Sequence, residues 1–544
     1  MTLPSTPEHT IFFNGQVVSV DSDNRLFEAM SIRDGIIEQL GTSTNVLSQK
    51  RHYTKLVDLK GRTLLPGIVD AHSHFPSTGL TTIGVSLYPS PIGKIRSRDQ
   101  LMHAVADAVE KQGDTNEWVL GLGYDNSLIF PPGHPDRKEL DRVAPATPVF
   151  LWHQSGHFAV VNTAGLQKLA LTDETDDPQG GFYGRYSDGS LNGLLAESAV
   201  PGLNEILSGR SLAEYRDVFR IAEHEYIANG ITTAQSGSAP RGLSQILKWI
   251  TRLGLTPLKF SVLERQSASG NTTNKWAISK HFSNRAVKLF VDGSPQGYTA
   301  SLTEPYYDQS GYNGNYRGSL LVNADELSAQ FSDINAQGRQ IAVHANGDRA
   351  IDTVISAFTK SGIDPQSDHR TLLIHAQTIR TDQLIKLQSL GISPSYFITH
   401  TYFFGDLHKD KVLGLGRAQN ISPLRSTQKL GIRFSLHSDS PVTPVDPMQI
   451  LWSATNRQTL SGLILGAREI INIENAVRAI TIDAAWQIFE DSSRGSLEPG
   501  KAADLVILSD KLIGYSGDIR NIAVDQTIID GRSVYIRKSP TSSP

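Results

Sequence analysis

The chain has 544 residues, of which 39% are hydrophobic and 19% charged, and its formal net charge is -4. This balance is typical of a globular protein and excludes a disordered chain. Because no long run of Lys or Arg occurs, we expect no nucleic-acid partner. The sequence contains no Cys, so a metal here would need His, carboxylate or a modified side chain as ligand.

The N-terminal residues show neither the basic start nor the apolar core of a secretory signal. No later run approaches the about 18 apolar residues of a membrane-spanning helix. We therefore expect a cytoplasmic protein with no membrane partner.

The two ends of the chain are β-rich. Residues 10–66 alternate short β-type runs with Gly, Asn and Asp turns, and 501–510 and 522–537 repeat this style. We predict one β-sandwich built from both termini, with 1–64 as its N-terminal part and 489–544 as its C-terminal part and flexible tail. The tail is the polar run RKSPTSSP at 537–544.

Between the ends, apolar runs are each followed by polar residues and a helical stretch, the alternation of an α/β protein with parallel strands. We predict a (β/α)₈ TIM barrel over 65–488. The gap of about 150 residues after the first run is too long for one crossover, and predicts an inserted α+β subdomain at about 80–228 that roofs the active site. The eight runs are 64–72, 231–235, 258–264, 287–293, 340–347, 371–377, 392–398 and 432–439.

Candidate metal ligands occur at the ends of these runs, where a barrel collects its active site. His72 and His74 in DAHSHF are two residues apart, so both imidazoles point the same way from an extended strand. His344, His375 and Asp439 close three later runs. Each has an ordinary structural explanation alone, but together they form a nitrogen and oxygen site suited to Zn²⁺, Mn²⁺ or Fe²⁺.

Lys288 lies inside the apolar run VKLFVDG. A buried lysine is unfavourable unless it is paired, neutral or chemically altered. One explanation is a buried salt bridge to Asp292, and another is a role at the metal site.

The motifs LPGIVDAHSHF, VKLFVDG, VHANGDRA, IHAQ, HSDSPV and GSLEPGKAADLVIL together resemble the amidohydrolase superfamily, and the resemblance covers nearly the whole chain. GYDNS, HPDRKELDRVAPATPVFLWHQSGH and NGLLAE are similar to the branch called amidohydrolase family 3, which includes N-substituted formamide deformylases. The resemblance implies a barrel flanked by a β-sandwich made from both termini.

The resemblance also implies a ligand set. His72, His74 and Asp439 would hold a buried divalent metal, Zn²⁺ first, and His344 and His375 a more exposed one. Lys288 would bridge the two as an N6-carboxylated lysine, although a one-metal site with unmodified Lys288 stays open. The sequence departs from many relatives at Ile374 and at 235–237, where acidic residues are often seen. This difference affects the residues around the ligands and leaves the ligands themselves in place.

The implied reaction is attack of a metal-bound hydroxide on an amide-type C–N bond, with Asp439 as general base. We expect a small-molecule amide, N-acyl or N-formyl, with an apolar or aryl group. Arg349 could bind a substrate carboxylate or hold a helix start. Residues expected in the pocket wall are Tyr124, Asp125, Trp152, His153, His157, Tyr298, Tyr402 and Phe403.

Other functions stay open at this point. The leading rival is a metal-dependent deaminase, followed by hydrolysis of a cyclic amide, carbamate or ester, because pocket shape decides between these reactions. A non-catalytic scaffold with the same fold is disfavoured by the complete set of expected ligands. Large barrels often pair, so a homodimer is one expected assembly.

Overall fold

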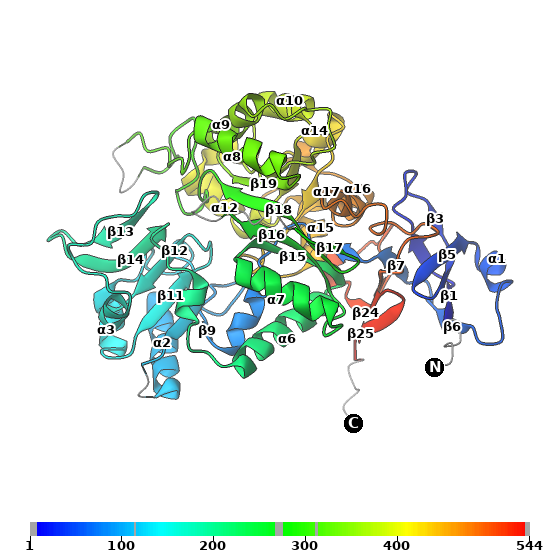
Figure 1. Cartoon of the computed structure of the whole chain (residues 1–544), viewed down its shortest axis with the longest axis horizontal. Coiled ribbons are helices and arrows are strands. Elements are labelled where there is room, and N and C mark those ends of the chain that lie inside the picture. The colour runs from blue at the N-terminus through cyan, green and yellow to red at the C-terminus, as the bar shows by residue number, and fades with distance from the viewer. Residues whose placement is uncertain (1–7, 114–115, 267–275, 310–313, 539–544) are drawn as a thin grey trace.

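The computed structural model describes residues 8–113, 116–266, 276–309 and 314–538. A central sheet with helices around it lies between an inserted sheet on one side and the β-strands of the two chain ends on the other (Figure 1). Most of the expected flexible tail falls outside the described residues.

The central sheet contains eight parallel strands in one continuous order. Their side chains are largely buried, as expected of parallel strands that are covered on both faces. A short strand, β17 (Ile278–Ser279), pairs antiparallel with β18. The order is β8 (Ile68–Val69), β15 (Ile231–Ala239), β16 (Lys259–Arg265), β18 (Phe282–Phe290), β19 (Gln340–Ala345), β20 (Leu372–His375), β21 (Ser393–Tyr396) and β22 (Ser435–Leu436).

The first and last strands of this order are connected by the segments that follow them. The Asp439 backbone N–H donates to His72 O at 3.2 Å, and the His74 backbone N–H donates to Ser440 O at 2.8 Å. The carboxyl ends of β8 and β22 therefore meet, and the architecture is of the TIM-barrel type.

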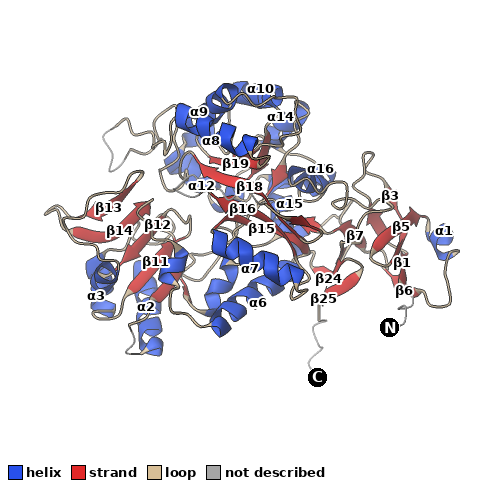
Figure 2. Cartoon of the chain, viewed as in Figure 1, coloured by secondary structure: helices blue, strands red, loops and turns tan. Residues whose placement is uncertain are grey.

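Helices cover the outside of the central sheet (Figure 2). Helix α9 shows why, since its buried residues Ala350, Ile351, Val354, Ala357 and Phe358 recur at helical spacing and form one apolar face. The helices are α6 (Leu212–Ala228), α7 (Arg241–Arg252), α8 (Ala324–Ala336), α9 (Asp348–Lys360), α10 (Thr381–Leu390), α11 (His400–Phe403), α12 (Gly405–Leu407), α13 (Gly414–Ala418), α14 (Leu424–Lys429), α15 (Pro447–Asn456), α16 (Ile473–Ala479) and α17 (Ile482–Gln487). Within the described ranges, none of the helices has the length and apolar character to cross a membrane.

The predicted run 64–72 is two strands rather than one. Strand β7 (Thr63–Pro66) pairs with the C-terminal strand β23, and only β8 continues into the central sheet. Both strands are fully buried, and a continuous apolar run does not indicate which of two sheets it joins.

The insertion between β8 and β15 contains its own sheet. Successive residues of β10 pack into different cores, because Leu120 contacts one cluster and Val119 another. The Gln154 side chain donates from Nε2 to Val442 O at 2.7 Å, which connects this sheet to the segment after β22. Its elements are β9 (Val85–Ser86), α2 (Arg98–Gln112), β10 (Val119–Tyr124), α3 (Arg137–Val143), β11 (Val149–His153), β12 (Phe158–Val161), α4 (Thr163–Lys168), β13 (Gly181–Arg185), β14 (Leu191–Glu197) and α5 (Leu203–Ile206).

The two ends of the chain share a sheet. Strand β7 lies between β2 and β23, and a hydrophobic cluster combines Phe12, Val17 and Leu64 with Leu505 and Ile507. Neither end could bury this apolar surface alone. The remaining elements are β1 (His9–Phe13), β2 (Gln16–Val18), β3 (Leu26–Phe27), β4 (Ala29–Arg33), β5 (Ile36–Gly41), α1 (Ser43–Leu47), β6 (Lys55–Asp58), β23 (Leu505–Leu508), β24 (Val524–Ile529) and β25 (Arg532–Ile536).

Candidate functional site

The six residues predicted as metal ligands lie at the carboxyl end of the central sheet. His72 and His74 follow β8, Asp439 follows β22, and the other three belong to β18, β19 and β20. This end is where TIM-barrel enzymes hold their active sites. The six are His72, His74, Lys288, His344, His375 and Asp439.

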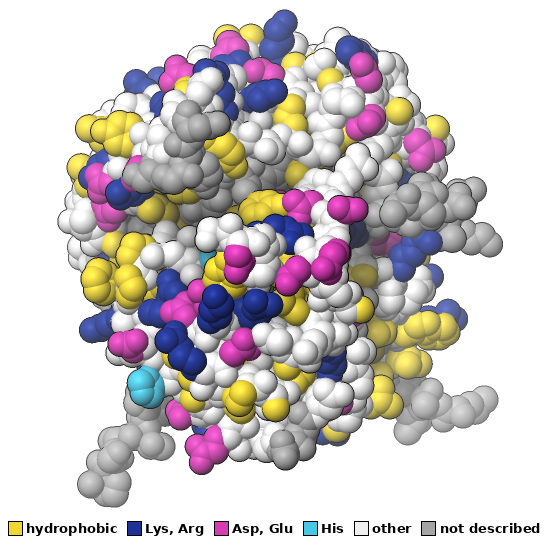
Figure 3. All heavy atoms as spheres, turned by 90° about the vertical axis from the view of Figure 1, so that its left-hand side faces the viewer, with side chains coloured by type: hydrophobic (Ala, Val, Ile, Leu, Met, Phe, Trp, Pro, Cys, Tyr) yellow, Lys and Arg dark blue, Asp and Glu magenta, His cyan; other side chains and the backbone are white. Residues whose placement is uncertain are grey.

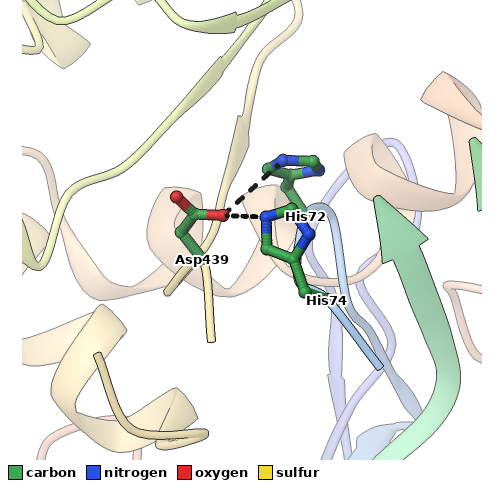
Figure 4. Close-up of side chains that lie close together, drawn as sticks. All are labelled: His72, His74 and Asp439. Carbon is green, nitrogen blue, oxygen red and sulfur yellow. Dashed lines mark ion pairs between the residues drawn. The ribbon is translucent and has the colours of Figure 1, made fainter. Parts of the chain in front are cut away.

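His72, His74 and Asp439 form a compact group in which one ligand atom from each lies within 4.8 Å of the others. Asp439 Oδ1 is 3.2 Å from His74 Nε2 and 3.6 Å from His72 Nε2 (Figure 4). Among the described residues, this buried carboxylate oxygen has no hydrogen-bond partner. A buried carboxylate oxygen without a hydrogen bond, next to two imidazole nitrogens, forms a set of ligand atoms that suits a metal cation.

The orientation of His72 is set by two polar neighbours. Its Nδ1 lies 2.8 Å from Gln235 Oε1, and its Nε2 lies 3.1 Å from Lys288 Nζ. An amide oxygen only accepts, so Nδ1 carries the proton and Nε2 offers a lone pair. Gly237 also belongs to this packing, because a Cβ there would lie 2.3 Å from His72 Cε1.

Lys288 is not paired with Asp292. Asp292 instead accepts the backbone N–H groups of Ser301, Asn346 and Gly347 at 2.8–2.9 Å. These donors occupy the carboxylate, so the salt bridge considered from the sequence does not form. Burial lowers the pKa of Lys288 to about 7, although the Asp439 carboxylate opposes the shift.

His344 and His375 lie next to each other, with ring centroids 4.5 Å apart. His344 Nε2 is 3.1 Å from Gly293 O, and His375 Nδ1 is 3.2 Å from His437 Nε2. Each imidazole is thus held through one nitrogen, which leaves the other for a ligand. Sequence reasoning missed His437, although it precedes Asp439 in the same HSD motif that pointed to the site.

Three imidazoles of the site, those of His72, His344 and His375, are held in their neutral form. Burial, followed by the charge of Lys288, holds the pKa of His72 and His344 well below the usual value. Burial, followed by His344 and His437, does the same for the pKa of His375. Neutral imidazole is the form that binds metal.

Several residues at strand ends have left-handed backbone conformations. The φ angle is 76° at His375, 47° at Ala376 and 53° at Asp439. Such conformations are unfavourable for residues other than Gly and recur at functional sites. Two of the predicted ligands therefore project from locally strained backbone.

A pocket opens beside the cluster. Both the barrel and the insertion contribute to its wall, since His157 and Ser155 come from the segment between β11 and β12. The other lining residues are Ser294, Gln296, His344, Asn346, His375, Phe397, His400, Asp439 and Val442.

His157 is bound to Glu197, with Nδ1 2.8 Å from Oε2. Burial alone would lower the pKa of His157, but the Glu197 carboxylate, followed by Asp292 and Asp439, raises it. The sequence pointed to His157 as a residue of the pocket wall, and it ends the quoted motif HPDRKELDRVAPATPVFLWHQSGH. Glu197 ends the quoted motif NGLLAE but was not named as a site residue, because it is 40 positions away and the spacing alone does not pair the two.

The residues expected to bind substrate occupy several places. Asp125 accepts from Ser127 N at 2.8 Å, and His153 lies 2.8 Å from Ser155 Oγ and 3.0 Å from Asn126 Oδ1. Both are buried within the insertion, and Tyr124 and Trp152 belong to its two hydrophobic clusters.

The other expected pocket residues come from the barrel. Tyr298 stacks on Tyr306 with ring centroids 4.7 Å apart. Arg349 is exposed on α9. Phe403 packs in a buried apolar cluster with Phe397, which itself lines the pocket, and Tyr402 packs against the edge of Trp452.

The surface on the side of the insertion carries Lys and Arg close to Asp and Glu (Figure 3). Positive and negative side chains of the described residues intermingle there, with neither sign alone extending over the face.

Comparison with known proteins assigns the chain to a family. The model of the amidohydrolase family matches residues 55–535. An N-substituted formamide deformylase of Arthrobacter pascens is 26% identical over 553 residues, which cover 97% of this chain and 98% of that protein. Protein LONG AFTER FAR-RED 3 of Arabidopsis thaliana is 28% identical over 549 residues, which cover 96% of this chain and 91% of that protein.

Among solved structures, an uncharacterized metal-dependent hydrolase of Pyrococcus horikoshii OT3 has a TM-score of 0.72 at 22% identity, and covers 97% of this chain and 100% of its own. At 22% identity, this structural likeness shows a shared fold and no more. Because the family match extends over most of the sequence, the chain belongs to the amidohydrolase family.

Proposed function

We propose that this protein is a metal-dependent hydrolase that cleaves the C–N bond of a small N-acyl or N-formyl amide. One observation carries the proposal. The Asp439 carboxylate is buried beside two imidazoles, and its Oδ1 has no hydrogen-bond partner in the part of the chain that the structure describes. A cation at this position would satisfy the oxygen, and the Cys-free donor set suits Zn²⁺ first, with Mn²⁺ or Fe²⁺ as alternatives.

In this proposal His72, His74 and Asp439 hold one divalent ion, while the remaining nitrogens of His344 and His375 are available to a second. In this proposal Lys288 bridges the two sets, since its Nζ lies 3.1 Å from His72 Nε2 in the first set. In the second set, burial lowers the pKa of His344 and His375, and the Lys288 charge adds to this lowering. Carboxylation of this amine by CO₂ would convert a buried nitrogen without a carboxylate partner into an anionic ligand.

When bound, a divalent ion supplies Lewis-acid polarisation of a carbonyl and a water of lowered pKa. Asp439 takes the proton of the attacking water and returns it to the leaving nitrogen, which requires a carboxylate beside the reacting atoms. Gln235 keeps His72 in the orientation that presents Nε2. The neutral amine then leaves.

The pocket wall suggests how an amide is oriented. Ser294, Gln296 and Asn346 line the pocket together with the histidines and suit a small polar acyl group. Phe397 and Val442 also line it, and they would accept an apolar or aryl substituent on nitrogen. Phe403 supports these two from behind.

The test is metal content per chain by elemental analysis, combined with a panel of N-formyl and N-acetyl amides. We expect about two equivalents of metal and turnover of at least one amide, with metal content reduced in His72→Ala and Lys288→Ala. About one equivalent that survives Lys288→Ala would instead support a mononuclear site.

Two outcomes would contradict the proposal. Absence of metal, with none taken up on incubation, would favour a non-catalytic scaffold. Release of ammonia from aminopurines or aminopyrimidines by a metal-loaded protein that cleaves no amide would favour a deaminase.

A further inference from the structure

The insertion contributes a histidine, hydrogen-bonded to Glu197, to the wall of the pocket next to the barrel histidines. His157 lines the pocket beside His344 and His375, and its ring centroid is 5.6 Å from that of His344. A molecule that occupies this pocket can therefore contact both the barrel histidines and His157.

His157 and Glu197 are joined at two points. The side chains meet through Nδ1 and Oε2 at 2.8 Å, and the Glu197 backbone N–H donates to His157 O at 2.8 Å. The two side chains are 15% and 11% exposed, so solvent weakens this pair little. A double connection of this kind fixes both the position of the loop and the plane of the imidazole.

The backbone and the carboxylate of Glu197 both have features that packing alone does not require. Glu197 has a left-handed backbone, with φ of 53°, and its buried Oε1 has no partner among the residues that the structure describes. Gly293 makes room for this oxygen, because a Cβ there would lie 2.5 Å from Glu197 Oε1. Strained backbone and an unsatisfied carboxylate oxygen beside a pocket are typical of sites that hold a group for function.

We propose that His157, oriented by Glu197, hydrogen-bonds the acyl oxygen of the bound amide through Nε2. This inference rests on the proposed function and adds to it a positioning residue supplied by the insertion. Within the described ranges, Nδ1 is the His157 ring nitrogen that has a hydrogen-bond partner, which leaves Nε2 for a ligand. The adjacent carboxylate favours the imidazolium form, which donates from both nitrogens.

Such a donor would act where negative charge grows. The acyl oxygen becomes an oxyanion as water adds, and a preorganised donor stabilises that state more than the ground state. Removal of one such donor typically lowers kcat by about 100-fold or more. Glu197 acts through His157, so its loss should have a smaller effect, of about 10-fold.

The test compares His157→Gln, Glu197→Gln and Glu197→Asp with wild type, and uses His103→Gln as the control, because His103 is an exposed residue of the same insertion. Metal content and the melting temperature are measured first, and both should equal those of wild type. Formate then serves as a binding probe, because its carboxylate carries the acyl oxygen of the product. We expect formate affinity to fall at least about 10-fold in His157→Gln and to stay unchanged in His103→Gln.

Kinetics on the best amide of the panel complete the test. We expect kcat to fall about 100-fold in His157→Gln with KM little changed, and partial recovery in Glu197→Asp relative to Glu197→Gln. Formate binding by wild type that equals that of His157→Gln, or no formate binding by either, would overturn the inference. Loss of formate binding in His157→Gln, in a protein that cleaves no amide, would support the His157 site while rejecting the proposed reaction.

Discussion

At the scale of single residues, the orientation of His72 depends on neighbours supplied by other strands. Gln235 on β15 accepts from Nδ1, and Lys288 on β18 donates to Nε2. The first contact selects the tautomer and the second occupies the lone pair that a metal would need. Gln235 therefore prepares His72 for a metal without itself being a ligand.

Replacement of Gln235 by Leu should weaken metal binding. Without the acceptor at Nδ1, His72 is free to change tautomer and rotate, and loss of such a partner typically lowers metal affinity about 10–100-fold. Metal retention during titration with a chelator measures the change. Gln235→Glu keeps an accepting oxygen and should retain more affinity, whereas equal loss in both variants would contradict this role.

Replacement of Asp439 by Asn should remove activity while the fold is retained. The amide keeps the shape of the side chain but cannot take a proton, and loss of a general base typically lowers the rate about 10²–10⁴-fold. Steady-state kinetics on a cleaved amide, with circular dichroism as the control for folding, check this. A rate close to that of wild type would exclude Asp439 as the base.

At the scale of elements, the barrel is connected to the terminal sheet by a buried ionic cluster. Lys259 Nζ on β16 lies 2.6 Å from Asp504 Oδ2 and 2.9 Å from Asp530 Oδ1. Asp504 precedes β23 and Asp530 follows β24. The Lys259 side chain is 1% exposed and that of Asp504 is 3% exposed, so either charge alone would be poorly solvated.

Lys259→Met should destabilise the protein by about 3–5 kcal/mol, because it leaves two carboxylates without their buried cation. Urea denaturation followed by fluorescence gives the free energy of unfolding. Lys280 offers a matched control, since it contacts the same Asp530 at 3.1 Å but is 60% exposed. Lys280→Met should cost less than about 1 kcal/mol, and similar losses in both variants would contradict the importance of burial.

The same cluster predicts a dependence of stability on pH. Burial alone would raise the pKa of Asp530, but hydrogen bonds from His281, Lys259 and Lys280, with the Lys259 charge, lower it. A carboxylate with a lowered folded pKa contributes stability above its unfolded pKa, about 3.9, and loses it as pH falls through the folded value. Asp530→Asn should therefore differ from wild type more at pH 7 than at pH 3. An equal difference in the free energy of unfolding at both pH values would contradict this.

At the scale of the whole molecule, three sheets depend on one another although they come from separate parts of the chain. Strand β7 lies between N-terminal β2 and C-terminal β23. The insertion, on the opposite side of the barrel (Figure 1), reaches the segment after β22 through Gln154 and Val442. Stability and pocket shape are therefore properties of the complete chain.

Truncation after residue 488 should prevent stable folding. It removes β23, leaves β7 as an open edge and deprives Lys259 of both carboxylate partners. Soluble yield and the melting temperature measure the effect. Truncation after Arg537 removes no described strand and should match wild type, and a 1–488 chain as stable as wild type would contradict the interdependence.

By itself, the sequence determined the features that depend on local pattern. Apolar runs separated by helical stretches predicted parallel strands, and all eight runs overlap strands of the central sheet. His344, His375 and Asp439 could be identified because each stands where such a run ends. The carboxyl ends of parallel strands meet at one end of a barrel, so sequence position alone predicted that these side chains gather.

The partners of those residues could be identified from the folded chain and not from the pattern of the sequence. Gln235 lies 163 positions from His72, and Lys259 lies 245 positions from Asp504, so no local period connects them. The separation of β7 from β8 likewise follows from tertiary pairing, because β7 pairs with β23 in the terminal sheet and β8 pairs with β15 in the central sheet. Local pattern specifies which face of an element is apolar, whereas contacts between distant segments follow from how the elements pack.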